Sequence, residues 1–128
     1  MALKKVGREE ALRFTRVVES DELRLPGSQI AAGAGGVFVT FGSLAEVEAF
    51  LVPTTPEEIL ASGMQGRLNH LDPPSLAMWV RDMIGDSELA DALDEVVASG
   101  RAFGLLVPEM KELLAERLAQ CEAVLAEE

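Results

Sequence analysis

The chain is poor in the residue types on which many catalytic, metal-binding and disulfide-bonded proteins depend. Its 128 residues include one cysteine, one histidine, one tryptophan, five phenylalanines and no tyrosine. A single cysteine excludes a disulfide within the chain and fits a reducing compartment. No apolar run approaches the roughly 20 residues that a membrane-spanning helix needs, and the charged first residues are unlike a signal peptide. We therefore expect a cytoplasmic protein with no membrane partner.

Basic residues are also scarce, because 11 Lys and Arg stand against 22 Asp and Glu, a net charge of −11. Residues 1–16 carry five basic and two acidic side chains, and the remainder carries a net charge of −14. An acidic body repels phosphate backbones, so we expect no nucleic-acid partner. The basic side chains near the start form either a small anion-facing patch or, as we favour, the solvated surface of a first helix.

The hydrophobic fraction of 48% is enough for a core, and we expect residues 1–128 to form a single domain. The pattern predicts a mainly α fold with a short β-hairpin or strand element near residues 22–41, which is α+β at the margin. The expected helices are 8–19, 44–52, 54–63, 73–84, 87–97 and one that Pro108 opens. Between them we expect turn chemistry at 26–28, a glycine-rich link at 31–36, a strand at 37–41 and a short helix or irregular turn at 64–71.

The most informative stretch is 72–97, which predicts two consecutive helices with a signal at each boundary. Asp72 precedes two prolines and is suited to cap the first helix, Gly85 is suited to end it, and Asp86 or Ser87 begins the next. Ser43 and Glu46 match a capping box at another helix start. The expected core residues are Leu76, Trp79, Met83, Leu89, Leu93, Leu114, Leu118 and Cys121.

His70 is the one candidate functional residue, because it is the only histidine. A metal site would need partners, and only Asp72 is near, so we favour a turn histidine that bonds locally. The glycines Gly33–Gly36 invite a phosphate-loop interpretation, but such loops follow a strand and precede a helix, whereas these glycines precede the strand. We favour a connector there, and we expect no catalytic, cofactor-binding or metal site.

Three further groups have a structural interpretation that we prefer to a chemical one. Cys121 lies on the apolar stripe of the last helix and is expected to be inert. The acidic residues between 82 and 95, with Asp91 and Asp94 on a shared side, are expected to form a solvated helix face. Gly42 and Ser43 are suited to a small anion, but helix capping explains them fully.

Several short matches lie in the C-terminal half: His70, Ala77-Met-Trp-Val80, Asp82-Met-Ile-Gly-Asp86, Glu88-Leu-Ala90 and 109–118. With these residues the chain resembles, over roughly residues 57–125, an uncharacterised prokaryotic family called domain of unknown function 5752. The tryptophan, glycine and aspartate follow in a fixed order within one helical hairpin. The resemblance implies a helical fold and no particular mechanism.

Three functions from different classes fit the sequence. The first, which we favour, is a non-catalytic protein-interaction or accessory domain that regulates or scaffolds a partner protein. In that case the apolar positions 114, 118, 121 and 125 of the C-terminal helix, which have coiled-coil-like spacing, suit a homo-oligomer. The second is a small enzyme or ligand-binding protein with a site between the Gly33–Gly36 loop and His70. The third is an acidic mimic of nucleic acid.

Overall fold

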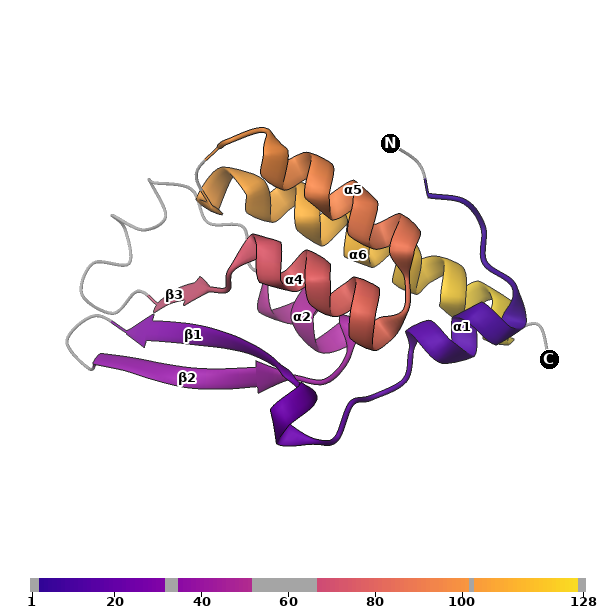
Figure 1. Ribbon diagram of the computed structural model, residues 1–128, viewed down its shortest axis with the longest axis horizontal. Helices are drawn as coiled ribbons and strands as arrows, with labels where there is room; N and C mark the ends of the chain where they lie inside the picture. The colour runs from indigo at the N-terminus through magenta and orange to yellow at the C-terminus, as the bar shows by residue number, and fades with distance from the viewer. Residues whose placement is uncertain (1–2, 32–34, 52–66, 102, 127–128) are drawn as a thin grey trace.

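The computed structural model describes residues 3–31, 35–51, 67–101 and 103–126. Figure 1 shows a small sheet along one side of the molecule and a layer of helices over it. The prediction of a mainly α fold with a hairpin near residues 22–41 is confirmed. The elements in chain order are α1 (Arg8–Phe14), a 3-10 turn (Asp21–Leu23), β1 (Leu25–Ala31), β2 (Gly35–Phe41), α2 (Leu44–Phe50), β3 (Arg67–His70), α4 (Pro73–Trp79), a π-helical turn (Val80–Ile84), α5 (Ser87–Ala98) and α6 (Phe103–Ala126).

The sheet has three antiparallel strands in the order β2-β1-β3. β1 pairs with β2 over seven residues, from Leu25 opposite Phe41 to Ala31 opposite Gly35. The expectation of a loose link over residues 31–36 is therefore wrong at Ala31, Gly35 and Gly36, which lie in paired strands. Residues 32–34 lie outside the described part of the chain. The sheet context outweighs the weak strand propensity of the two glycines.

Two further predictions about strands are wrong. Residues 26–28 lie inside β1 and form no turn, and Arg67–His70 forms β3 where we expected a short helix or an irregular turn. A proline is tolerated at position 26 because β3 pairs only with residues from Ser28 onward, so β1 has one neighbouring strand at that point. β3 is stabilised by pairing with β1, a contact that no local pattern reveals.

The helical unit over residues 72–97 has the boundaries that its sequence signals predict. Asp72 accepts the N–H of Ser75 (3.2 Å), Gly85 takes a left-handed conformation (φ 85°), and Asp86 caps α5. One detail is new, because the first helix passes into a π-helical turn before Gly85. There the N–H groups of Gly85 and Asp86 both donate to the carbonyl of Val80, at 2.9 and 3.2 Å.

Two other helices differ from the prediction at one end. α1 ends at Phe14 and not near residue 19, and the hydroxyl of Thr15 donates to the carbonyl of Ala11 (2.7 Å) at that end. α6 begins at Phe103, so Pro108 lies inside the helix and does not open it. The hydrogen bond that a proline forgoes is outweighed there by the burial of Leu106 and Val107. The helix expected at 54–63 lies outside the described residues.

The hydrophobic core lies mainly among the helices, with Leu25 and Phe41 contributed by the sheet, and it includes most of the residues that the sequence pointed to. Leu76, Trp79, Leu89, Leu93, Leu114 and Cys121 are buried, and Met83 and Leu118 are partly buried and pack against them. The indole N–H of Trp79 donates to the carbonyl of Leu23 (2.9 Å), which satisfies the polar atom of this ring. In the part of the chain that the structure describes, no helix combines the length and apolarity needed to cross a membrane.

Candidate functional site

Arg117, on α6, is a charged side chain that is almost completely buried, with 1% of its surface exposed. Its guanidinium donates to Asp86 Oδ2 through Nε (2.6 Å), to Glu88 Oε1 through Nη2 (2.6 Å), and through Nη1 to Gln120 Oε1 (2.6 Å) and the carbonyl of Lys4 (2.8 Å). A buried guanidinium is tolerated only when paired and hydrogen-bonded, and this one meets both conditions.

The carboxylate of Asp86 connects this cluster to the start of α5. Its Oδ1 accepts a hydrogen bond from the N–H of Leu89 (3.0 Å) and so caps the helix, while its Oδ2 accepts one from the Nε–H of Arg117. We had expected Asp86 to belong to a solvated acidic face, and this is wrong, since only 1% of its surface is exposed. The left-handed Gly85 ends the preceding helix and lets the chain turn so that Asp86 faces α6.

Burial and pairing act against each other in the pKa values of this cluster. Burial lowers the pKa of Arg117, but hydrogen bonds to Glu88 and Asp86 outweigh it and raise that pKa. Desolvation likewise acts to raise the pKa of Glu88, and hydrogen bonds from Arg117 and the backbone of Lys4 outweigh it and lower that pKa. Both groups are therefore held in their charged forms.

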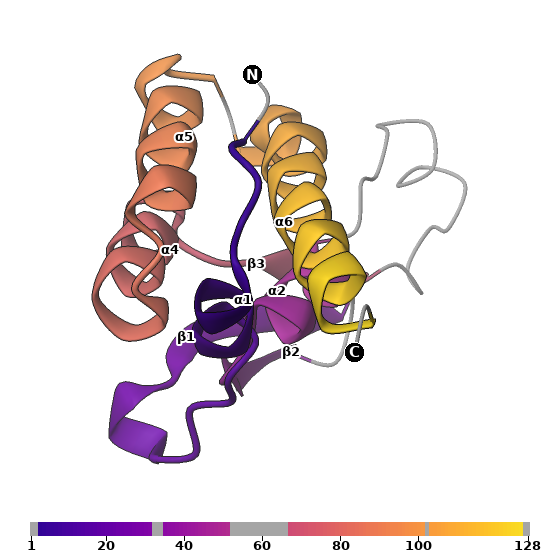
Figure 2. The ribbon, with the colours of Figure 1, turned by 90° about the vertical axis from the view of Figure 1, so that its right-hand side faces the viewer.

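The segment of residues 3–6, which we call the N-terminal segment, runs between α5 and α6 toward α1 (Figure 2). Side chains of the two helices bind the backbone of its first two residues on both the N–H and the C=O side. The bonds are Leu3 N–H to Glu116 Oε1 (3.2 Å), Gln120 Nε2 to Leu3 C=O (3.1 Å), Lys4 N–H to Glu88 Oε1 (3.0 Å) and Arg117 Nη1 to Lys4 C=O (2.8 Å).

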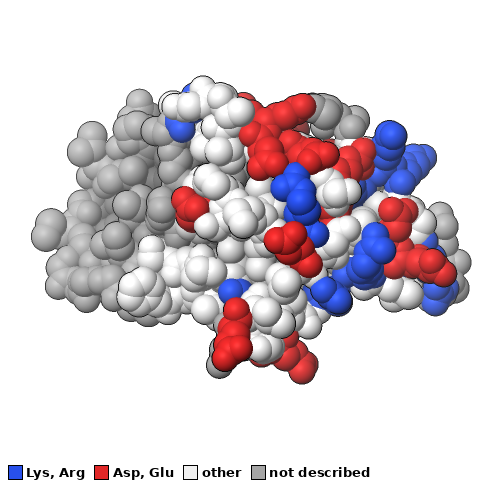
Figure 3. Space-filling view, in the orientation of Figure 1, with Lys and Arg blue, Asp and Glu red and all other residues white. Residues whose placement is uncertain are grey.

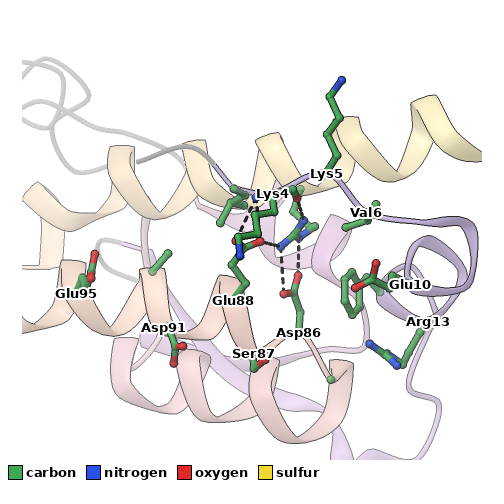
Figure 4. A pocket seen from close by; sticks show the side chains of 15 residues that line it. Lys4, Lys5, Val6, Glu10, Arg13, Asp86, Ser87, Glu88, Asp91 and Glu95 are labelled. Carbon is green, nitrogen blue, oxygen red and sulfur yellow. Dashed lines mark hydrogen bonds and ion pairs between the residues drawn. The ribbon is translucent and has the colours of Figure 1, made fainter.

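The side chains of the N-terminal segment divide by polarity. Leu3 and Val6 are buried in the core, whereas Lys4 and Lys5 are exposed. Figure 4 shows the Lys5 side chain extending away from the helices. The segment is therefore anchored by its main chain and by two apolar side chains three residues apart.

A groove of about 630 Å³ lies beside this segment, lined by the segment, by α1 and by the beginning of α5 (Figure 4). Glu10, Arg13 and Phe14 come from α1, and the guanidinium groups of Arg13 and Arg117 lie 5.0 and 5.4 Å from the centre of the Phe14 ring. The lining carries charges of both signs. We call the space between α5 and α6, with the N-terminal segment in it and this groove beside it, the α5–α6 cleft.

The residues that the sequence singled out lie elsewhere. His70 ends β3 opposite Ser28, and β3 lies at the far end of the molecule from α1 in Figure 1. Residues 33 and 34 lie outside the described residues, and Gly35 and Gly36 are in β2. The structure thus places His70 and the two described glycines in one sheet, away from the α5–α6 cleft.

The other candidates have local structural partners. Asp91 and Asp94 share a side of α5, where Arg81 bonds to both (2.6 and 3.0 Å). Cys121 is buried, and burial raises the pKa of its thiol, which opposes thiolate formation. Among the described His, Cys, Asp and Glu side chains, no three are grouped so as to hold a metal ion.

The capping box at the start of α2 is present, and it gives Gly42 and Ser43 a structural role. The carboxylate of Glu46 accepts the N–H of Gly42 (2.9 Å) and the hydroxyl of Ser43 (3.1 Å). Burial acts to raise the pKa of Glu46, but these bonds and those from Arg24 outweigh it and lower that pKa. The N–H of Gly42 and the hydroxyl of Ser43 are thus already bonded to Glu46.

The apolar stripe of α6 packs inside the chain. Leu114 and Cys121 have no exposed surface, and Leu118 and Leu125 pack partly buried against the core. Leu114 and Cys121 thus belong to the core of the chain itself, and a homo-oligomer through this stripe stays a prediction.

Arg117 and the N-terminal segment were missed by the sequence analysis. A signal for Arg117 was present, because positions 110, 114, 117 and 121 follow one helical stripe and only the third is charged. A charged residue on an otherwise apolar stripe indicates a buried ion pair. For the N-terminal segment the signal is weaker, namely two apolar residues that flank two lysines.

Charges of both signs are interspersed on the face that Figure 3 shows, where Lys and Arg lie among Asp and Glu. This arrangement gives the nucleic-acid mimic no support on that face. No protein-family model, curated protein or solved structure matches the chain. The resemblance to domain of unknown function 5752 stays a prediction.

Proposed function

We propose that this chain is a non-catalytic protein-interaction domain whose α5–α6 cleft binds an extended segment of polypeptide. One observation carries the proposal: side chains of two helices bind both the N–H and the C=O groups of Leu3 and Lys4. Neither residue belongs to a helix or strand, so its backbone groups depend on these side chains. This is the chemistry by which a protein binds an extended peptide irrespective of most of its sequence.

The N-terminal segment also indicates which peptides the cleft would accept. Buried positions for Leu3 and Val6 select apolar residues three apart. Glu88 and Glu116 lie beside the backbone of this segment, and their negative charge favours basic residues between the two apolar ones. The partner we infer is a protein with such an extended segment, which competes with residues 3–6 for the cleft. The proposal includes the cytoplasmic location that the sequence suggests, so the partner is expected in the cytoplasm.

The proposal can be tested with the 128-residue chain carrying Leu3→Ser and Val6→Ser, which loosens the N-terminal segment. A fluorescent, N-acetylated peptide of residues 3–7 is titrated with this variant and with the unchanged protein. We expect fluorescence anisotropy to show binding to the variant and, because the native segment competes, at least about tenfold weaker binding to the unchanged protein.

The matched control is the same peptide with serine in place of its leucine and valine. We expect it to bind neither protein, because its two apolar anchors are gone. Equal binding of the two peptides, or no binding of the first one at about 1 mM, would contradict the proposal.

A further inference from the structure

β2 is an edge strand of the sheet. In the described part of the chain it pairs with β1 alone, so its other edge has backbone N–H and C=O groups with no strand partner. The carbonyl of Thr40 is already bonded to the Arg24 guanidinium (3.1 Å). The groups available for further pairing therefore come from the residues before Thr40.

Apart from the contact of Arg24 with Thr40 at one end, this edge has little of the usual protection against pairing with another strand in the described part of the chain. Residues 25–45 contain no Lys, Arg, Asp or Glu, although 26% of the whole chain is charged. β2 contains no proline, and its seven-residue register with β1 runs without a bulge. Natural edge strands are commonly protected by charges, prolines or bulges. An edge with so little protection favours pairing with a further strand.

The exposed side chain of Phe38 is a second feature of β2 that favours pairing with another strand. Along β2, Phe41 is buried and Val39 packs against the core, whereas Phe38 is 90% exposed. Phe38 is also the middle residue of Gly35–Phe41. An antiparallel pairing of this strand with itself that is centred on its middle residue therefore places Phe38 opposite the same residue of a second copy. Opposed aromatic residues on neighbouring strands stabilise such a pair.

We infer that β2 pairs with β2 of a second copy, which joins two three-stranded sheets into one of six strands. Antiparallel self-pairing is symmetric, so both copies use the same edge and the assembly closes as a dimer. With a net charge of −11, two copies repel each other. The uncharged hairpin is where that repulsion is weakest, which favours this surface over the charged helices. The inference is independent of the α5–α6 cleft.

Sedimentation equilibrium from about 10 µM to about 1 mM tests it, with the unchanged protein, Phe38→Lys and Leu105→Lys. Leu105 is the matched control, because it is 63% exposed on α6 and outside the hairpin. We expect a dimer for the unchanged protein and for Leu105→Lys, and a dimer dissociation constant at least about tenfold higher for Phe38→Lys. Phe38→Thr, which keeps a residue suited to strands, is expected to lie between them, and far-UV circular dichroism checks that each variant is folded.

Amide hydrogen exchange locates the contact. We expect alternate amides of β2, those that do not bond to β1, to exchange more slowly at high than at low protein concentration. A monomer throughout the range, equal effects of Phe38→Lys and Leu105→Lys, or a dimer that leaves these amides unprotected would overturn the inference. A monomer whose β2 amides are protected only by an added extended peptide would also overturn it, and would assign the edge to another kind of partner.

Discussion

Around Arg117, a buried cation is surrounded by carboxylate, amide and carbonyl oxygens, whereas the β1–β2 hairpin has no charged side chain over its whole length and exposes the ring of Phe38. The first region uses paired charges to fix a short extended segment between two helices. The second leaves backbone groups and an aromatic ring open at one edge. The two regions thus treat backbone groups differently: side chains of α5 and α6 bond to the backbone of Leu3 and Lys4, whereas one edge of β2 has no strand partner among the described residues.

The largest effect is expected from Arg117→Leu. It leaves the carboxylate of Asp86 buried without its cation, and breaking one side of a buried pair costs about 3–5 kcal/mol of the free energy of unfolding. Chemical denaturation followed by far-UV circular dichroism measures this loss. The control is Arg101→Leu, which removes an ion pair with Glu109 (2.5 Å) whose partners are both partly exposed. A loss as large in the control as in Arg117→Leu would show that burial does not set the contribution of these pairs.

A smaller effect is expected on acidification. Because the folded-state pKa of Glu88 is lowered, its contribution to stability is fully present above the ordinary pKa of a glutamate. That contribution is lost as the pH falls through the lowered, folded-state pKa. We therefore expect the free energy of unfolding to decrease as the pH falls from the ordinary pKa of a glutamate through the lowered pKa of Glu88. The decrease should be less steep in Glu88→Gln. Denaturant titrations of both proteins between neutral and acidic pH measure how steeply the free energy of unfolding depends on pH. An equal dependence in the two proteins would contradict the contribution assigned to Glu88.

The smallest effect is expected from Phe38→Thr, because a side chain that is 90% exposed contributes little to the stability of the single chain. In dilute protein, where copies do not associate, we expect a change within about 0.5 kcal/mol. Phe41→Thr in the same strand is the contrast, because Phe41 is buried with its ring centre 4.5 Å from that of Phe50. It should cost about 3–5 kcal/mol. Similar losses in the two variants would mean that Phe38 is also part of the core.

The features that the sequence predicted well depend on neighbouring residues. Asp72, Gly85 and Asp86 act on helix ends within a few positions of themselves, so their residue types were sufficient to place those ends. The missed features depend on distant residues. Arg117 bonds to Asp86, 31 positions away, and to Lys4, 113 positions away. β3 likewise pairs with β1, about 40 positions away in the sequence. Composition and spacing describe neither contact, so the candidate site was found only in the folded chain.

The most direct test of the central claim, that helix side chains in the α5–α6 cleft bind an extended backbone, is the exchange rate of the Lys4 amide hydrogen. Its N–H donates to Glu88, whereas the N–H of Gly7, three residues on, donates to Glu10 and serves as an internal control (3.0 Å in each case). We expect nuclear magnetic resonance to show a protected Lys4 amide in the unchanged protein. In Glu88→Ala, which removes the acceptor, that protection should fall several-fold while Gly7 is unaffected. A Lys4 amide that exchanges as fast as in an unfolded chain, or one whose exchange rate is unchanged in Glu88→Ala, would contradict the account.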